Sequence, residues 1–410
     1  MISFNDAKDI IDKNLPMIDK TEEIELDKAL MRVCAKDVFA KENILNFKRC
    51  AVDGFAIRSE DIKVGMEKGL KIVDAIDAGE ISEIAVRRGE CIKVATGCKL
   101  PQNCTMVIMI EDTQIINEDK IVILKTSNNK NYDDIGSDVK KGEKIVNKGE
   151  ILTPPKIGLL AANGNAKIEV YGKFKIGILI TGDEIIPLNG VHERELKNGK
   201  IYDSNSYIIK SMLAGFFTIK HYGIVNDVKE DIDKILERAW QDDEIDIMIM
   251  TGGTSMGDKD IAYKIIEEKG DMLFHKLFIK PGKPTFFGKV KDKSIIGLPG
   301  NPTSAFIIID ALFLPILFKK SRLKFKEKRI SAILDNDVET GDRDTLMPFK
   351  LKEAEGKVYA ENTFKHSGAI SSVSQADGYA MIPANSKFKM GQKIDGILFH
   401  FKSCDYLRTI

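Results

Sequence analysis

The chain has 410 residues, which is long for one hydrophobic core, so we expect two to four domains. Its 43% hydrophobic and 30% charged residues are ordinary for a soluble globular protein. Lys plus Arg and Asp plus Glu both number 62, and a formal net charge of zero argues against a nucleic-acid binder.

The cysteines and the apolar segments both favour a cytoplasmic protein. The six cysteines are scattered without a CxxC pair, so we expect reduced thiols rather than disulfides or a zinc site. The N-terminus has no basic region followed by a long apolar run, and we therefore expect no signal peptide. The most apolar stretch, 305–318, contains Asp310 and Pro315, which indicates a buried core helix and no membrane span.

The first 170 residues predict helices at both ends and short strands between them. Apolar residues recur at helical spacing over 3–40, and a helix that begins with proline is expected over 153–164. From 44 to about 150, short β-branched runs alternate with Gly, Pro and Asn. We therefore predict an N-terminal helical domain (1–43 with 141–170) and an inserted small β-domain (44–140).

Strands and helices alternate from 174 onward, which predicts a multidomain α/β plus β protein. Strands are expected at 174–180, 217–225, 245–250 and 294–298, with helices near 204–215, 228–240, 258–269 and 302–318. This alternation favours a largely parallel sheet with helices on both faces, an α/β/α domain over 171–320. The tail, 321–410, returns to short strands and predicts a C-terminal β-domain, barrel-like in form.

Glycine-rich turns follow two of the expected strands, where open α/β sheets bind ligands. TGGTSMGDKD (251–260) offers backbone N–H groups and hydroxyls to a phosphate, and LPGNPTSA (298–305) places Asn301 as N-cap and Pro302 in the first helical turn. The first lacks the GK[ST] ending of a P-loop, and either turn can be only a tight strand-to-helix connection. The candidate binding residues are Gly252, Gly253, Ser255, Pro299, Gly300, Asn301 and Pro302.

Charged residues accompany these turns. Lys276 and Lys280 lie four residues apart in an extended stretch, so alternation places both on one face, where they can bind an oxyanion or form a solvated edge. Glu184 in TGDEI and Asp260 are the candidate carboxylates for Mg²⁺. Glu184 can instead cap a helix, whereas Asp260 is less needed structurally because Asp258 can serve as the N-cap. The sequence thus predicts a site for a phosphorylated ligand and a metal ion.

The motifs AVDGFAIR, ATGCKLP, GSDVKKGE, LITGDEI, IYDSNS, TGGTSMGDKD, KLFIKPGKP and GLPGNPTSA occur in the order typical of one family. Over essentially its whole length the chain resembles the molybdopterin molybdenumtransferases, the MoeA enzymes, which include the E domain of gephyrin. The resemblance implies that the 171–320 domain is a molybdopterin-binding domain. It also implies an elongated four-domain homodimer whose active site is shared between subunits.

The implied reaction is Mg²⁺-dependent insertion of molybdate into molybdopterin-adenylate with release of AMP. On this reading molybdate and molybdopterin-adenylate are substrates, and the molybdopterin adenylyltransferase is a candidate partner. The resemblance assigns catalytic roles to Asp53, Glu184, Asp260, Lys276 and Lys280, with Asp53 supplied by the second subunit. It adds three substrate-binding residues: Thr96, Asp138 and Asp227.

One segment departs from the family pattern. An RxxGED-like segment is usual, but here DDIGSD (133–138) puts Asp133 at the arginine position and Ser137 at the glutamate position. Two other functions stay open, a gephyrin-like scaffold and a molybdopterin adenylyltransferase. The chain lacks gephyrin's other domain and linker, and adenylyltransferases that share only the α/β/α domain are shorter. Molybdate and tungstate are not distinguished, since both are tetrahedral dianions of nearly equal size.

Overall fold

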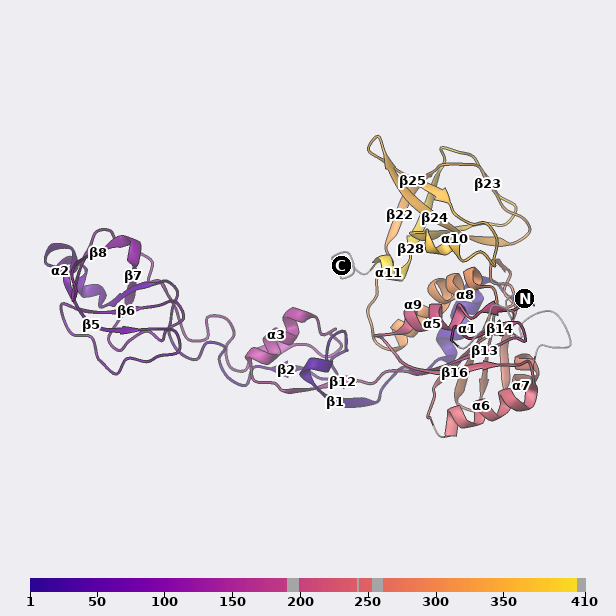
Figure 1. Cartoon of the computed structure of the whole chain (residues 1–410), viewed down its shortest axis with the longest axis horizontal. Coiled ribbons are helices and arrows are strands. Elements are labelled where there is room, and N and C mark those ends of the chain that lie inside the picture. Colours follow the sequence, from indigo (N-terminus) through magenta and orange to yellow (C-terminus); the bar gives the residue numbers. More distant parts are fainter. Residues whose placement is uncertain (190–198, 242, 253–260, 404–410) are drawn as a thin grey trace. The chain divides into compact units, whose positions relative to one another are not determined.

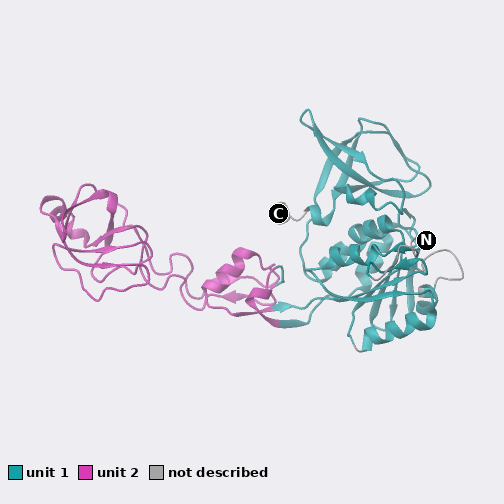
Figure 2. Ribbon diagram, in the orientation of Figure 1, with its two compact units in different colours: residues 1–22, 31–33, 170–410 teal, residues 23–30, 34–169 magenta. Residues whose placement is uncertain are grey.

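The computed structural model describes residues 1–189, 199–241, 243–252 and 261–403 (Figure 1). The chain forms two compact units, shown in Figure 2: residues 1–22, 31–33 and 170–410 make the first, and residues 23–30 and 34–169 the second. Each unit contains its own sheets and its own hydrophobic clusters. The finer division into four domains stays a prediction.

The first unit is built around a six-stranded sheet in the order β16-β13-β17-β21-β20-β18. β16, β13, β17 and β21 run parallel, whereas β20 pairs antiparallel with both β21 and β18. This confirms the predicted largely parallel sheet. The strands are β13 (Lys175–Thr181), β16 (Thr218–Val225), β17 (Ile247–Thr251), β18 (Asp271–His275), β20 (Phe286–Val290) and β21 (Lys293–Leu298).

Helices cover both faces of this sheet. Alternate strand residues such as Leu179, Met248 and Met250 pack with apolar side chains of α6 (Lys229–Gln241) and α7 (Ile261–Lys269). α5 (Asn205–Leu213) and α8 (Pro302–Ile308) pack together away from that cluster, and α5 contacts β13 (Figure 1). The predicted α/β/α arrangement is therefore confirmed.

The apolar segment near 310 is a core helix, as predicted. Among the described residues, Pro302–Lys320 is the one helix long and apolar enough to cross a bilayer. Of its most apolar 18 residues, 83% are buried inside the protein. It comprises α8, a π-helical turn (Ile309–Phe313) and α9 (Leu314–Lys320). The wider turn directly precedes Pro315, whose ring would otherwise press against the carbonyl four residues earlier.

The C-terminal strands close into a five-stranded barrel, which confirms the barrel-like prediction. β24 pairs with β25 through its second half and with β26 through its first half, and β25-β22-β28-β26 completes the ring. The short strand β19 (Ile279–Lys280) adds to β24. The barrel strands are β22 (Arg329–Leu334), β24 (Asp344–Ala354), β25 (Lys357–Asn362), β26 (Gly378–Ile382) and β28 (Lys393–Leu398).

The predicted helix over 3–40 is wrong beyond its first three turns. α1 (Phe4–Asn14) ends where Leu15 turns extended, because the residue before a proline, here Pro16, is disfavoured in the helical region. Thr21–Glu25 then forms strand β1, and only a single 3-10 turn, Leu26–Lys28, follows. Met31 adopts a positive φ of 60°, which interrupts any longer helix.

The second unit has a six-stranded sheet in the order β7-β4-β6-β5-β9-β8. The β-branched runs expected between 44 and about 150 form strands β4, β5, β6, β7 and β9, whereas β8 and the short helix α2 (Ile62–Glu67) were not foreseen. The predicted helix at 153–164 is α3 (Pro154–Ala162), which packs on the 3-10 turn at Leu26–Lys28. The strands are β4 (Gly54–Ile57), β5 (Leu70–Ile76), β6 (Glu90–Val94), β7 (Met106–Met109), β8 (Thr113–Asn117) and β9 (Lys120–Ile123).

Candidate active site

The carboxyl ends of β13, β17 and β21 meet at one edge of the central sheet, because these three strands are parallel neighbours. A cavity of about 830 Å³ lies there. Its walls come from the loops after the three strands, from the segment before α5, and from a loop of the C-terminal barrel. The predicted residues that line it are Glu184, Asp227, Gly252, Pro299, Gly300, Asn301 and Pro302.

Gly252 shapes the floor of the cavity through a close backbone approach. Its φ is +88°, and a Cβ built on it would lie 1.9 Å from the carbonyl oxygen of Thr181. No other residue type fits this position without displacing the end of β13. Gly300 lies opposite Gly252. A Cβ built on Gly300 would lie 3.7 Å from the Cα of Gly252, which is an ordinary van der Waals contact. The glycines at two neighbouring strand ends thus leave the backbone open to a ligand.

Asn205, at the start of α5, ties the strand ends together. Its amide Nδ2 donates to the carbonyl oxygen of Gly300 at 2.7 Å and, at 3.4 Å, to the hydroxyl of Thr251. Its own Oδ1 is buried and makes no hydrogen bond within the described structure, and the same is true of the Thr181 hydroxyl. Both residues line the cavity. Since buried polar atoms are rarely left unpaired, these two oxygens indicate contacts to a bound ligand.

Asp203 holds the start of α5 in place. The residue is 4% exposed, and its carboxylate accepts hydrogen bonds from the backbone N–H of Ser206 at 3.0 Å and from the Ser206 hydroxyl. Asp203 thus satisfies a backbone N–H in the first turn of α5. The IYDSNS segment does more than cap a helix, however, because Tyr202, Asp203, Ser204 and Asn205 all line the cavity.

The C-terminal barrel domain completes one wall of the cavity. Asn301 stands at the N-cap position of α8, but its amide donates to the hydroxyl of Ser367 at 3.0 Å instead of capping the helix. Thr303 donates to the carbonyl oxygen of Ala369 at 2.7 Å. Gly368 and Ile370 line the cavity as a result. Sequence reasoning missed this loop because nothing in its pattern links it to a sheet edge more than sixty residues earlier.

The two predicted lysines do not line this cavity. Lys276 adopts a positive φ of 72° between β18 and β19, and its N–H donates to Thr285. The expected alternation is wrong here because an extended chain is needed for residues four apart to share a face. Lys280 is exposed, with its ammonium group 6.0 Å from the ring centre of Phe364.

Asp53 and Thr96 lie together in the second unit. Oδ1 of Asp53 accepts hydrogen bonds from the Thr96 N–H at 2.6 Å and from the Thr96 hydroxyl at 2.8 Å. These bonds, the backbone one foremost, lower the pKa of the exposed Asp53 carboxyl below its usual value of 3.8. Asp138 is also exposed in this unit. Asp133, at the family's arginine position, forms an ion pair of 2.7 Å with Arg49.

Three predicted residues, Gly253, Ser255 and Asp260, lie outside the described residues. Within the described part of the chain, no three His, Cys, Asp or Glu side chains gather as a metal site. The residues that line the cavity nevertheless include two carboxylates, Glu184 and Asp227, and two further oxygen ligands, the Thr181 hydroxyl and the Asn205 amide oxygen. Mg²⁺ prefers such ligands and usually binds through one or two carboxylates plus substrate phosphate, so these residues fit it.

Comparison with known proteins covers nearly the whole chain. A family model for the MoeA N-terminal region (domain I and II) matches residues 2–164, one described as "Probable molybdopterin binding domain" matches 177–319, and one for the MoeA C-terminal region (domain IV) matches 332–399. The molybdopterin molybdenumtransferase of Haemophilus influenzae is 32% identical over 322 residues, 78% of either chain. That of Staphylococcus aureus strain COL is 30% identical over 387 residues, 92% of this chain and 90% of its own.

Solved structures agree with this result. The crystal structure of the molybdopterin biosynthesis MoeA protein from Pyrococcus horikosii superposes with a TM-score of 0.78 at 30% identity. The match covers 97% of this chain and 99% of that one.

Proposed function

Since this chain belongs to the MoeA family of molybdopterin molybdenumtransferases, we propose that it inserts molybdate into molybdopterin-adenylate and releases AMP. The enzyme acts in molybdenum cofactor biosynthesis. The observation that carries the finer proposal is the cavity at the three strand ends, where glycine backbone, two carboxylates and two unpartnered oxygens converge. A phosphorylated ligand matches these groups.

Within this proposal, Glu184 and Asp227 would hold Mg²⁺, and Asp260 would contribute a third carboxylate. When bound, the ion would neutralise charge on the adenylate phosphates and on the departing AMP. The backbone at Gly252 and Gly300 binds the phosphate, and Asn205 fixes these two loops relative to each other. Thr181 donates its hydroxyl hydrogen to the substrate. This fixed arrangement aligns the adenylate for cleavage.

Lys276 and Lys280 remain the proposed oxyanion ligands, outside the wall of the adenylate cavity. Asp53, Thr96 and Asp138 are proposed to act from the second subunit of a homodimer, in the cytoplasm. Because the Asp53 carboxyl has a lowered pKa, it is ionised at neutral pH. It therefore suits contact with a cation or with the donor groups of the substrate rather than proton donation.

The test is an AMP-release assay with purified protein and molybdopterin-adenylate, run with molybdate, tungstate or no oxyanion, each with and without Mg²⁺. We expect AMP only when both an oxyanion and Mg²⁺ are present. AMP release that is independent of oxyanion would contradict the insertion reaction. Product formation from ATP and molybdopterin would instead identify an adenylyltransferase.

A further inference from the structure

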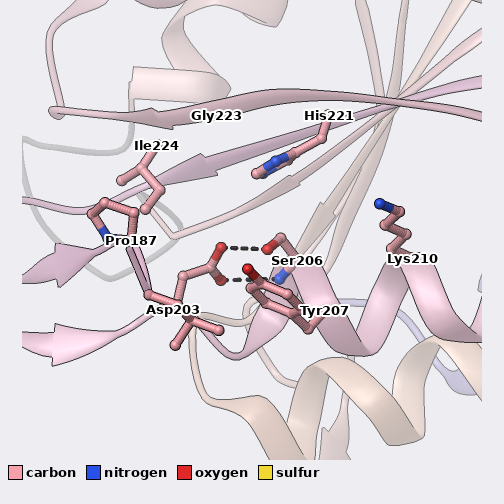
Figure 3. Close-up of a pocket in the computed structure, with 9 residues that line it drawn as sticks. Pro187, Asp203, Ser206, Tyr207, Lys210, His221, Gly223 and Ile224 are labelled. Carbon is pink, nitrogen blue, oxygen red and sulfur yellow. Dashed lines mark hydrogen bonds between the residues drawn. The ribbon is translucent and has the colours of Figure 1, made fainter. Parts of the chain in front are cut away.

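A second cavity of about 300 Å³ lies beside the first, on the side of the edge strand β16. The loop after β14 (Ile185–Ile186) contributes Pro187, α5 contributes Tyr207 and Lys210, and β16 contributes His221 (Figure 3). Asp203 lines both cavities, so one buried residue forms part of the wall of each. No step of the proposed reaction above uses this second cavity.

The carboxylate in this cavity is already engaged, whereas the cationic and hydroxyl groups are not. Both oxygens of Asp203 accept hydrogen bonds from Ser206, as the dashed lines in Figure 3 mark. By contrast, the Lys210 ammonium group, the His221 ring and the Tyr207 hydroxyl have no hydrogen-bond or ion-pair partner among the described residues. Lys210 and Tyr207 therefore present unpaired donors to this cavity, and the His221 ring adds one N–H when neutral and two when protonated, which suits an anion.

The charges around His221 reinforce this preference. Loss of water around the ring lowers the pKa of His221, the carboxylate of Asp203 raises it, and the positive charge of Lys210 lowers it again. The positive charge of the Lys210 ammonium group thus disfavours protonation of the His221 ring. An anion placed between them would favour the protonated ring and remove this repulsion.

We propose that this second cavity is an oxyanion subsite, in which Lys210, His221 and Tyr207 bind a tetrahedral oxyanion such as phosphate. Pro187 and Ile224 supply apolar walls, whereas Lys210 and Tyr207 are exposed, so the site is open to an ion from solution. Two sources share this chemistry. If the proposed function is correct, the oxyanion is either a phosphate group of the nucleotide or free molybdate waiting beside the adenylate cavity.

The binding test measures oxyanion binding without turnover. A negative result would therefore reject the subsite and leave the proposed reaction, which is tested by AMP release, unaffected. The protein is labelled with ¹³C at its histidine rings, and the His221 signal is assigned from its loss in His221→Gln. Sodium phosphate is then added at constant ionic strength. We expect a saturable shift of the His221 signal and a higher pH midpoint for its titration, with the signals of His275, His366 and His400 unchanged.

Matched lysine variants test the role of charge. Lys210→Ala removes one charge-assisted hydrogen bond and should weaken phosphate binding roughly tenfold or more. Lys234→Ala makes the same change on the exposed face of α6. Lys234 does not line this cavity, so this variant should bind phosphate as the unchanged protein does. Tyr207→Phe should weaken binding by a smaller factor, because it removes a neutral donor.

Three probes distinguish the sources. A response to AMP that Glu184→Gln weakens identifies a nucleotide phosphate that reaches both cavities. A response to molybdate and phosphate without one to AMP identifies a site for free oxyanion. If all three probes leave the His221 titration unchanged, or if Lys210→Ala and Lys234→Ala behave alike, the subsite does not exist.

Discussion

Thr96 directs both its backbone N–H and its hydroxyl at the same carboxylate oxygen of Asp53, at 2.6 Å and 2.8 Å. Forty-three residues separate the two in sequence, and two separate motifs, AVDGFAIR and ATGCKLP, supply them. Each motif is weak evidence alone. Their direct contact shows that they form one structural element of the second unit.

The first prediction concerns the ionisation of Asp53. Because its pKa is lowered in the folded state, its hydrogen bonds stabilise the protein above pH 3.8, and this contribution is lost as the pH falls through the lowered pKa. Thr96→Val removes the hydroxyl donor and should move the pKa back toward 3.8. Carboxyl NMR titration measures it. An unchanged pKa in Thr96→Val would assign the whole effect to the backbone donor.

Glu184 should be required for catalysis and its neighbour should not. Glu184→Gln removes a negative charge from the cavity wall, and we expect AMP release to fall roughly 100-fold, with more Mg²⁺ needed for half-maximal rate. Asp183→Asn is the matched control, because Asp183 is exposed and does not line the cavity. Equal losses in the two variants would show that the effect is not specific to the site.

Asp260→Asn should abolish AMP release without unfolding the protein. The prediction rests on the sequence alone, since Asp260 lies outside the described residues. Circular dichroism and thermal unfolding serve as the fold control. Turnover that survives the substitution would remove Asp260 from the catalytic residues.

Gly252→Ala should both destabilise the fold and disrupt the cavity. The new methyl group would lie 1.9 Å from the Thr181 carbonyl oxygen, at a φ of +88°. Gly215→Ala isolates the backbone strain, because its φ is +86° and nothing lies within 4 Å of the added methyl. We expect a cost of about 1–2 kcal/mol for Gly215→Ala and clearly more for Gly252→Ala. Similar costs would mean that the end of β13 moves freely.

Asn205→Ala should lower stability by about 1–3 kcal/mol, because the Gly300 carbonyl and the Thr251 hydroxyl lose their shared donor. Ser211→Ala, on the exposed side of the same helix, should have little effect. Trp240 is the only tryptophan in the chain and packs on the core of the central sheet, so its fluorescence reports urea unfolding of that sheet. A cost for Asn205→Ala no larger than that of the control would contradict the linking role.

Local patterns predicted the central sheet well because its strands are continuous apolar runs with helices between them. The strand ends therefore converge where the rule for open α/β sheets expects, and Glu184, Gly252 and Pro302 meet there. The contact between Asn301 and Ser367 was not predictable, since it depends on how the barrel packs on α8. The alternation argument for Lys276 and Lys280 was wrong because Lys276 has a positive φ, and nothing in the sequence signals that conformation for a lysine.

The closure of the C-terminal barrel also bears on the order of events during synthesis. β22 and β26 both hydrogen-bond to β28, which is the last of the barrel strands in sequence and ends at Leu398. The ring therefore closes only after Leu398 has left the ribosome. Since Gly368 and Ile370 of the barrel region line the adenylate cavity, a nascent chain without β28 cannot offer a complete cavity to its substrate. Binding competence should therefore arise only after the barrel has closed.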